Sequence, residues 1–277
     1  MKRLIILIGL ITFTGASFLS AQPKGIYEKD ITDKSPVPYP YLREADVMWS
    51  KKIIRIIDLR EKMNLPLYYP TFPLGDRRSL IDVIMEAVRS GEVTVYKARL
   101  NDDEMIEPTT LGEIESNMGA RIDSNWVTDP VTNQQILTVS KPEFNTAEIK
   151  QYLVQEEWYF DNKHSVMKVR ILGLCPARIY LHPDTGEPAK RKAFWVYFPE
   201  LRNILARNEA YNKYNDAHRI SYDDLFMQRR FSSYIIAESN LYDNRQITDY
   251  ETGRMVLLEA DKIKEWLMNF EHDLWEY

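Results

Sequence analysis

Cysteine is almost absent from this chain of 277 residues, in which Cys175 is the single example. An intramolecular disulfide is therefore excluded, so the fold must be stabilised by its core. Zinc sites built from several cysteines are excluded for the same reason. Cys175 ends an apolar, strand-like run at residues 169–175. That setting predicts a buried, inert thiol, because free cysteine is among the most buried residue types; a nucleophile or an intermolecular disulfide is the alternative.

Histidine and glycine are also scarce, and neither forms a catalytic motif. No two of the four histidines have the i, i+4 spacing of a zinc-protease helix, and the ten glycines include no phosphate-binding loop. The triplet Asp184-Thr185-Gly186 also occurs in aspartic proteases, but here it lies among prolines and charges, which favours a tight surface turn. We therefore expect no enzyme activity, no cofactor, and no catalytic or metal-binding residues. The histidines are His164, His182, His218 and His272.

The charge balance is acidic, with a formal net charge of −5. This sign argues against non-specific nucleic-acid binding, which needs lysine and arginine to displace counterions. Hydrophobic residues make up 44% of the chain and charged residues 28%, which is ordinary for a globular protein.

The first 41 residues differ from the rest. Lys2 and Arg3 precede an apolar run at 4–19, and small residues follow it, which predicts a signal peptide over 1–21. A retained membrane anchor is the alternative, but the run is shorter than the ~20 residues of a spanning helix. Residues 22–41 contain four prolines and many charges, so we expect a flexible, proline-rich arm. The folded domain is expected over residues 42–277.

Periodicity within that domain predicts a mixed architecture. We expect helices over 46–63, from about 76 to 91, over 199–207 and over 221–230, and a short helix opened by a capping box at 110–113. Strands are expected over 92–98, 135–140 and 192–198, with a hairpin formed by 151–160 and 166–180 around a five-residue loop. The fold class is α+β: a single mixed globular domain with a central β-sheet region, flanking helices and a long C-terminal helix.

The C-terminal helix has the clearest pattern. Its apolar residues recur at alternating steps of four and three, while charged residues fill the other faces. Docking onto the chain's own sheet is the favoured interpretation, and a coiled-coil contact with a partner is the alternative. The apolar seam consists of Val256, Ala260, Ile263, Leu267, Phe270 and Leu274.

Several segments along the chain together resemble the GldN family of gliding-motility proteins, called PorN in non-gliding relatives. The resemblance begins with YPYLREADVMWSKK at 39–52 and IDLREKMNLP at 57–66. It continues at 157–161, 169–176, 194–200, 223–226, 229–234 and 269–275. This resemblance implies a structural protein of the periplasm, peripheral to the outer membrane, in the type IX secretion system. It implies three contacts: a GldK- or PorK-like ring lipoprotein, a GldM- or PorM-like inner-membrane protein, and other copies within a ring. It implies no catalytic residues.

One junction is a candidate partner-binding site: Arg43, Glu44 and Asp46, beside Trp49, where the proline-rich arm meets the first expected helix. In the structural interpretation, Asp46 only caps that helix and Trp49 belongs to the core. In the functional interpretation, the junction docks on the lipoprotein and the arm wraps around it. Two other function classes remain as alternatives: a secreted glycan-binding module and a secreted hydrolase that uses Cys175 or paired carboxylates.

Overall fold

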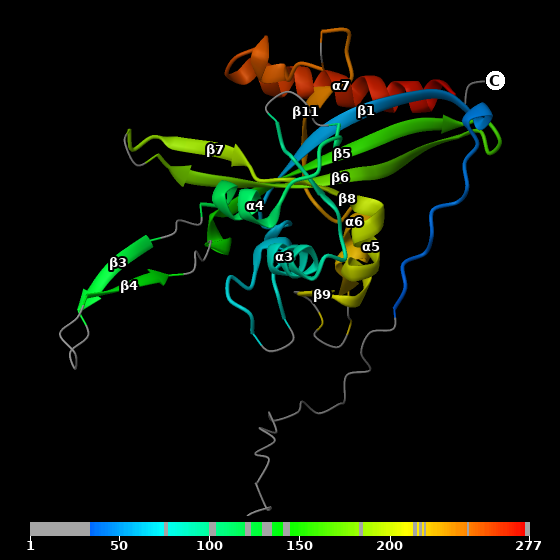
Figure 1. Cartoon of the computed structure of the whole chain (residues 1–277). Helices are drawn as coiled ribbons and strands as arrows, with labels where there is room; N and C mark the ends of the chain where they lie inside the picture. Colours follow the sequence, from blue (N-terminus) through cyan, green and yellow to red (C-terminus); the bar gives the residue numbers. More distant parts are fainter. Residues whose placement is uncertain are drawn as a thin grey trace, which may run out of the picture. The chain divides into compact units, whose positions relative to one another are not determined.

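A seven-stranded antiparallel sheet organises the fold, in the order β11–β1–β5–β6–β8–β2, with β7 also paired to β6 (Figure 1). The long strands are β1 (Val47–Asp58), β5 (Ile149–Asp161) and β6 (Val166–Leu181). The shorter ones are β2 (Val95–Tyr96), β7 (Pro188–Lys192), β8 (Trp195–Tyr197) and β11 (Tyr234–Glu238). Two further pairs join β3 (Asp123–Thr128) to β4 (Gln135–Ser140) and β9 (Glu209–Ala210) to β10 (Ile220–Ser221).

This computed structural model describes residues 34–74, 77–99, 104–119, 123–128, 135–140, 145–182, 185–212, 215, 218, 220–242 and 244–274. These residues all belong to one compact unit, Asp33–Tyr277. The expected signal peptide at 1–21, residues 22–33 of the arm and Asp184 of the proposed turn lie outside them.

Strand β1 corrects the helix expected over residues 46–63. Three- and four-residue spacing of Trp49, Ile53 and Ile56 suggested a helix, but residues 47–58 form a strand paired on both sides. The run Ile53-Ile54-Arg55-Ile56-Ile57 is rich in β-branched residues, which lose side-chain freedom in a helix and pack well on a pleated sheet. Ile56 lies opposite Leu153 of β5 and Tyr234 of β11, so pairing between distant segments overrides the local periodicity.

The hairpin prediction is confirmed. Strands β5 and β6 pair from Asp161↔Val166 at the turn to Ile149↔Arg178 at the far end, with two irregularities in register. Cys175 lies within β6 and is 0% exposed, as expected for an inert core thiol.

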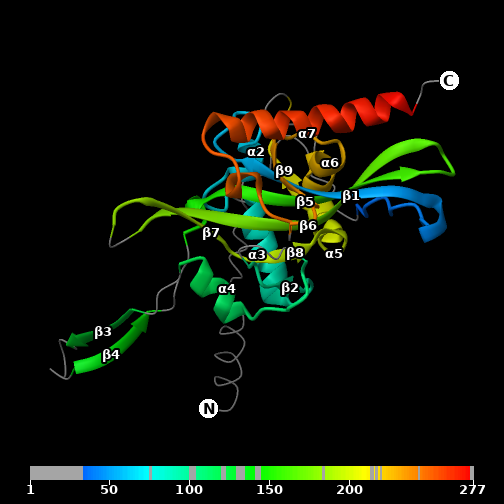
Figure 2. The same ribbon diagram turned by 90° about the horizontal axis from the view of Figure 1, so that it is seen from above.

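One set of helices packs against the sheet to form the largest core cluster (Figures 1 and 2). It includes α3 (Leu80–Ser90), α5 (Phe198–Arg207) and α6 (Tyr222–Met227), and their buried residues meet Ile57, Tyr152 and Leu174 of the long strands. The remaining short helical elements are α2 (Leu65–Tyr68), α4 (Leu111–Asn117) and the 3₁₀ turns η1 (Glu44–Asp46), η2 (Thr146–Glu148) and η3 (Ile247–Asp249).

Helix boundaries follow the local chemistry in α3 and α6. The Ser79 side chain caps α3 by accepting from Asp82 N, and Gly91 ends it with a left-handed φ of 76°. A capping box between Ser221 and Asp224 opens α6. The capping box expected at Thr110 is wrong: α4 begins there, but the Thr110 side chain makes no cap, and Thr109 bonds Glu113 instead.

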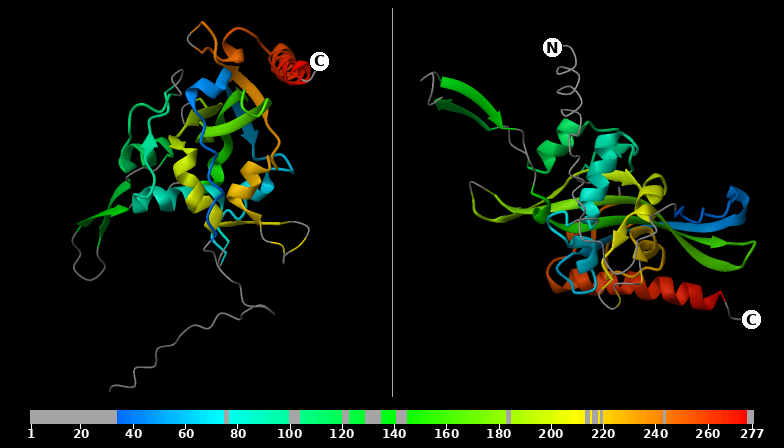
Figure 3. Two further views of the ribbon diagram at one scale, coloured as in Figure 1. Left: turned by 90° about the vertical axis from the view of Figure 1, so that its right-hand side faces the viewer. Right: turned by 90° about the horizontal axis from the view of Figure 1, so that it is seen from below.

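Helix α7 (Arg254–Asp273) docks on the chain's own sheet, as the favoured interpretation predicted. Ala260, Ile263 and Leu267 of the seam are buried in one cluster with Ile53 of β1 and Ile235 of β11. The helix runs beside β1 and β11 in Figures 1 and 2 and is seen almost end-on in Figure 3 (left).

Candidate partner-binding surface

The three long strands extend beyond their neighbours to form a structure that we call the finger. It comprises residues 47–52 of β1, 157–161 of β5 and 166–170 of β6. Strand β11 pairs with β1 only at Ile53–Ile56, and β7 and β8 contact β6 only from residue 173 onward. Among the described residues, the finger strands therefore form their ladders only with one another, apart from one backbone hydrogen bond from Ser239 to Lys52 at the base of the finger. In Figures 1 and 2 they reach past α5 and α6 and end at η1.

The tip of the finger carries three of the four candidate residues, Arg43, Glu44 and Asp46. Two hydrogen bonds of 2.8 and 2.9 Å run from the Arg43 guanidinium to the Asp46 carboxylate. This donation lowers the pKa of Asp46. The tip is tied to the β5–β6 turn, because Asn162 N donates to the Asp46 carbonyl at 2.9 Å. The expected helix cap is absent, and Asp46 instead belongs to an ion-paired 3₁₀ turn.

Asp161 makes the β5–β6 turn a defined structure. Its carboxylate lies 2.7 Å from Lys168 Nζ and 2.7 Å from His164 Nδ1, and accepts from the backbone N–H of Lys163 at 3.1 Å. Donation by Lys168 and then His164 holds the pKa of Asp161 well below its usual range. A carboxylate with several donors stays ionised and fixes the loop that supplies them. The finger tip is therefore a preformed, highly charged surface.

Trp49, the fourth candidate, lies away from the other three. Its ring is 4.8 Å from Phe270 and 5.8 Å from Trp266 of α7, and Lys51 Nζ is 4.9 Å from the Trp266 ring centre. Trp49 thus packs under the C-terminal helix, whereas Arg43, Glu44 and Asp46 form the tip. The structure brings together three of the predicted residues and assigns the tryptophan to the contact between α7 and β1.

The described part of the arm, residues 34–41, has no helix or strand and contacts the domain through a few side chains. Tyr39 lies against Arg202 of α5 and Arg170 of β6, with guanidinium carbons 4.5 and 5.2 Å from its ring centre. Arg170 also donates to the Pro40 carbonyl at 2.6 Å, and Lys34 pairs with Asp224 of α6. The sequence offered no signal for this docking, because it depends on residues more than a hundred positions away. The flexibility of the arm remains a prediction.

A buried ionic cluster lies where the finger joins the main sheet. Glu156 is 0% exposed, and its carboxylate accepts from Arg55 Nε at 2.9 Å and from Trp158 Nε1 at 3.0 Å. Arg229 Nη2, from the segment after α6, lies 2.8 Å from the other oxygen. Burial, the largest cause, lowers the pKa of Arg55. Sequence analysis missed this cluster, because the alternation of Glu156 and Glu157 in a strand does not say which of the two faces inward.

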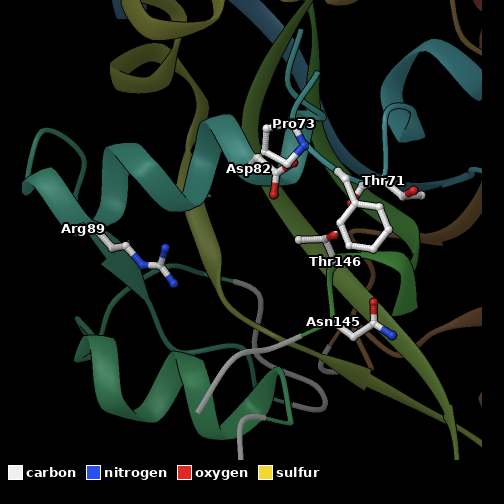
Figure 4. A pocket seen from close by; sticks show the side chains of 7 residues that line it. Thr71, Pro73, Asp82, Arg89, Asn145 and Thr146 are labelled. Atoms are coloured by element: carbon white, nitrogen blue, oxygen red, sulfur yellow. Dashed lines mark hydrogen bonds between the residues drawn. The ribbon is translucent and has the colours of Figure 1, made fainter. Parts of the chain in front are cut away.

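A pocket of about 620 Å³ opens beside α3. Asp82 and Arg89 of α3 lie along one side, and Asn145 and Thr146 lie opposite (Figure 4). Asp82 is bonded to Ser79, and Arg89 lies 3.8 Å from Glu115, so the lining charges already have partners.

The described residues offer neither a candidate metal cluster nor a candidate membrane-spanning helix. They contain no group of three or more His, Cys, Asp or Glu side chains placed to hold a metal ion. Within the same residues, no helix has the length and apolarity needed to cross a membrane.

Comparison with known families gives one match that covers most of the chain. A family model described as gliding motility associated protein GldN matches residues 42–276. The chain belongs to the GldN family. The GldN match includes the finger, the sheet, its helices and all of α7, and it begins directly after the arm residues 34–41. The resemblance to GldN is thereby confirmed, and the chain is a gliding-motility-associated protein. No curated protein matches it.

Proposed function

We propose that this GldN-family protein is a structural subunit of a periplasmic ring in the type IX secretion and gliding machinery. In this proposal it is held at the outer membrane by a GldK- or PorK-like lipoprotein and contacts a GldM- or PorM-like inner-membrane protein. The chain acts by binding and not by catalysis, and it needs no cofactor. The observation that carries the proposal is the family match over residues 42–276.

Two surfaces of different chemistry support a role in ring building. A closed ring uses head-to-tail contacts, so each subunit needs two different faces. The finger tip is charged and preformed by the Arg43–Asp46 pair and the Asp161 turn. The outer side of α7 instead exposes apolar residues, including Leu257 at 55% and Met268 at 60%. We assign the finger tip to the lipoprotein contact, since it holds Arg43, Glu44 and Asp46.

The test is co-purification of the chain with a tagged lipoprotein from cells that make both. Arg43→Asp should weaken co-purification, because it places like charges together at the tip. The double variant Arg43→Asp, Asp46→Arg keeps a local ion pair but reverses its direction. If the lipoprotein recognises the charge pattern of the tip, the double variant should also co-purify weakly. Its thermal unfolding should still match that of the parent, which shows that the fold is intact.

Glu92→Lys is the matched control, since Glu92 is an exposed charge at the end of α3. It should bind like the parent. Failure of the parent chain to co-purify with the lipoprotein would refute the proposed function. Normal binding by both tip variants would move the contact to another surface.

A further inference from the structure

The domain contains a ready-made site for the tyrosine of the arm, which we call the Tyr39 niche. It is built from Tyr159 of β5, Arg170 of β6, Arg202 of α5 and Met227 of α6. The Tyr39 hydroxyl donates to Met227 Sδ at 3.6 Å, and its ring lies against both guanidiniums. Tyr39 is half-buried, and this burial raises the pKa of its hydroxyl.

Both guanidiniums of the niche have hydrogen-bond partners within the domain, in addition to the bond from Arg170 to the Pro40 carbonyl of the arm. Arg202 forms two hydrogen bonds to Asp223, at 2.9 and 3.1 Å, and both residues are buried. Arg170 Nε donates to the Tyr159 hydroxyl at 3.1 Å. Because these contacts lie within the domain, the two guanidinium faces stay in place when Tyr39 leaves. The niche can therefore accept the same tyrosine from a different chain.

The arm is attached weakly enough to leave. Val37 is 80% exposed and Tyr41 is 91% exposed, on either side of Tyr39. Pro36, Pro38 and Pro40 have no backbone N–H, so this segment is a poor partner for the unpaired edge of β6. The described arm is attached by the Tyr39 ring on two cations, its hydroxyl on Met227, the Lys34–Asp224 pair and the Pro40 carbonyl on Arg170. Cation–π contacts are weak at exposed sites and stronger where the cation is buried, as Arg202 is, so the Tyr39 ring is the main attachment of the arm.

The attachment point favours exchange. The arm joins the domain at the finger tip, where Tyr41 and Arg43 are exposed, so a rotation there swings the arm away from its own domain. Eight extended residues span at most about 29 Å, so the arm can reach only a copy whose niche lies within that distance of the finger tip. The contacts in an exchanged arrangement are identical to those in the single chain. The equilibrium between the arm in its own niche and the arm in a neighbour's niche is then set by the effective concentration of the neighbouring niche. A ring makes that concentration high.

We propose that in the assembled state the arm docks in the Tyr39 niche of the adjacent copy, with Tyr39 and Lys34 as its contacts, and so links successive subunits. This inference rests on the proposed function, because the neighbouring copy must be held close. The occupant is a second copy of this chain, since its arm carries the same tyrosine and lysine that contact Arg170, Arg202 and Asp224 here.

Thiol crosslinking tests this exchange without altering the contacts. Val37→Cys is placed on the arm and Gln228→Cys beside Met227, and the two single variants carry different tags. They are made together with the lipoprotein and treated with a short bismaleimide linker. We expect a covalent dimer that carries both tags. The isolated double variant should instead give an adduct of monomer mass. Val37→Cys with Lys264→Cys on α7 is the control pair, and the parent chain controls for Cys175, which is buried.

Further variants identify the contact. Tyr39→Ala should lower the yield of the two-tag dimer about tenfold, whereas Tyr41→Ala should leave it unchanged. Tyr39→Phe keeps the ring and should retain most of the dimer. Arm exchange is refuted if the complex with the lipoprotein forms but the yield of two-tag dimer is no higher than for the control pair. That result leaves the proposed function intact. Absence of both the complex and the dimer refutes both proposals.

Discussion

Glu156 offers the sharpest test of how the finger is joined to the domain. Glu156→Gln conserves side-chain volume and removes one negative charge from between two guanidiniums. Arg55 is 7% exposed and Arg229 keeps 32% of its side chain exposed, so Arg55 has much less access to water once its counter-charge is gone. The glutamine oxygen can still accept from Arg55 and Trp158, but its NH₂ group then faces Arg229.

The expected loss follows from these contacts. Removing one partner of a buried ion pair costs roughly 3–5 kcal/mol, because the remaining charge is left without compensation. Two hydrogen bonds survive and Arg229 can turn toward solvent, so we expect the lower end, about 3 kcal/mol in the free energy of unfolding. Glu157→Gln is the matched control: it is the next residue and partly exposed, and should change stability by less than about 0.5 kcal/mol.

Urea unfolding followed by tryptophan fluorescence measures both variants, and Trp158 reports directly on the site. The midpoint should fall for Glu156→Gln with an unchanged slope, which assigns the loss to the folded state. The pair Arg55→Met, Glu156→Leu provides a second check, because replacing both charges by apolar groups avoids the unpaired arginine. It should be more stable than Glu156→Leu alone. A loss below about 1 kcal/mol for Glu156→Gln would refute the assignment of a desolvated charge cluster.

Three other predictions concern single sites. Leu267→Ala should cost about 2–4 kcal/mol by urea unfolding, since Leu267 is 3% exposed on the buried face of α7, whereas Met268→Ala, 60% exposed, should be nearly neutral; equal losses would contradict the docking of α7. Gly91→Ala should cost about 1 kcal/mol in the same assay through its left-handed φ of 76° alone, because a Cβ there meets no atom within 4 Å; a stabilised variant would show that the helix ends differently. The side-chain hydrogen bond from Arg60 lowers the pKa of Asp58 from 3.8 to about 2, so its stabilisation is present above about pH 4 and is lost as the pH falls toward 2. The stability difference between the parent and Asp58→Asn should shrink over that interval, and a constant difference would exclude this linkage.

Local signals in the sequence predicted some elements well, one as the wrong type of element, and others not at all. The β5–β6 hairpin was predictable because its strands adjoin and a polar turn separates them. Helix α3 was predictable from its apolar face and the glycine at its end. Strand β1 was not, because its apolar residues fit helical steps, and its partners Leu153 and Tyr234 lie far along the chain. Strand β11, which is only five residues long, was also missed.

The candidate surface was predictable only in part. The charged residues Arg43, Glu44 and Asp46 stood out because they follow a proline-rich segment. Their place at the tip depends on the bond between Asn162 and Asp46, which no local pattern reveals. The Tyr39 niche likewise draws on two strands and two helices, so its four residues share no motif in the sequence.

The pairing of β1 has a consequence for the order in which the chain acquires structure. Ile56 has Leu153 and Tyr234 as its cross-strand neighbours. Both lie far C-terminal to it, so β1 is synthesised long before either partner exists. Pairing between such distant segments is slow, and an unpaired apolar strand is prone to aggregate in the interval. Arg55 interrupts the isoleucines of this strand, and a charge within an apolar run is the kind of residue that suppresses premature association. The arginine that is neutralised by Glu156 in the finished fold thus protects β1 while it is still alone.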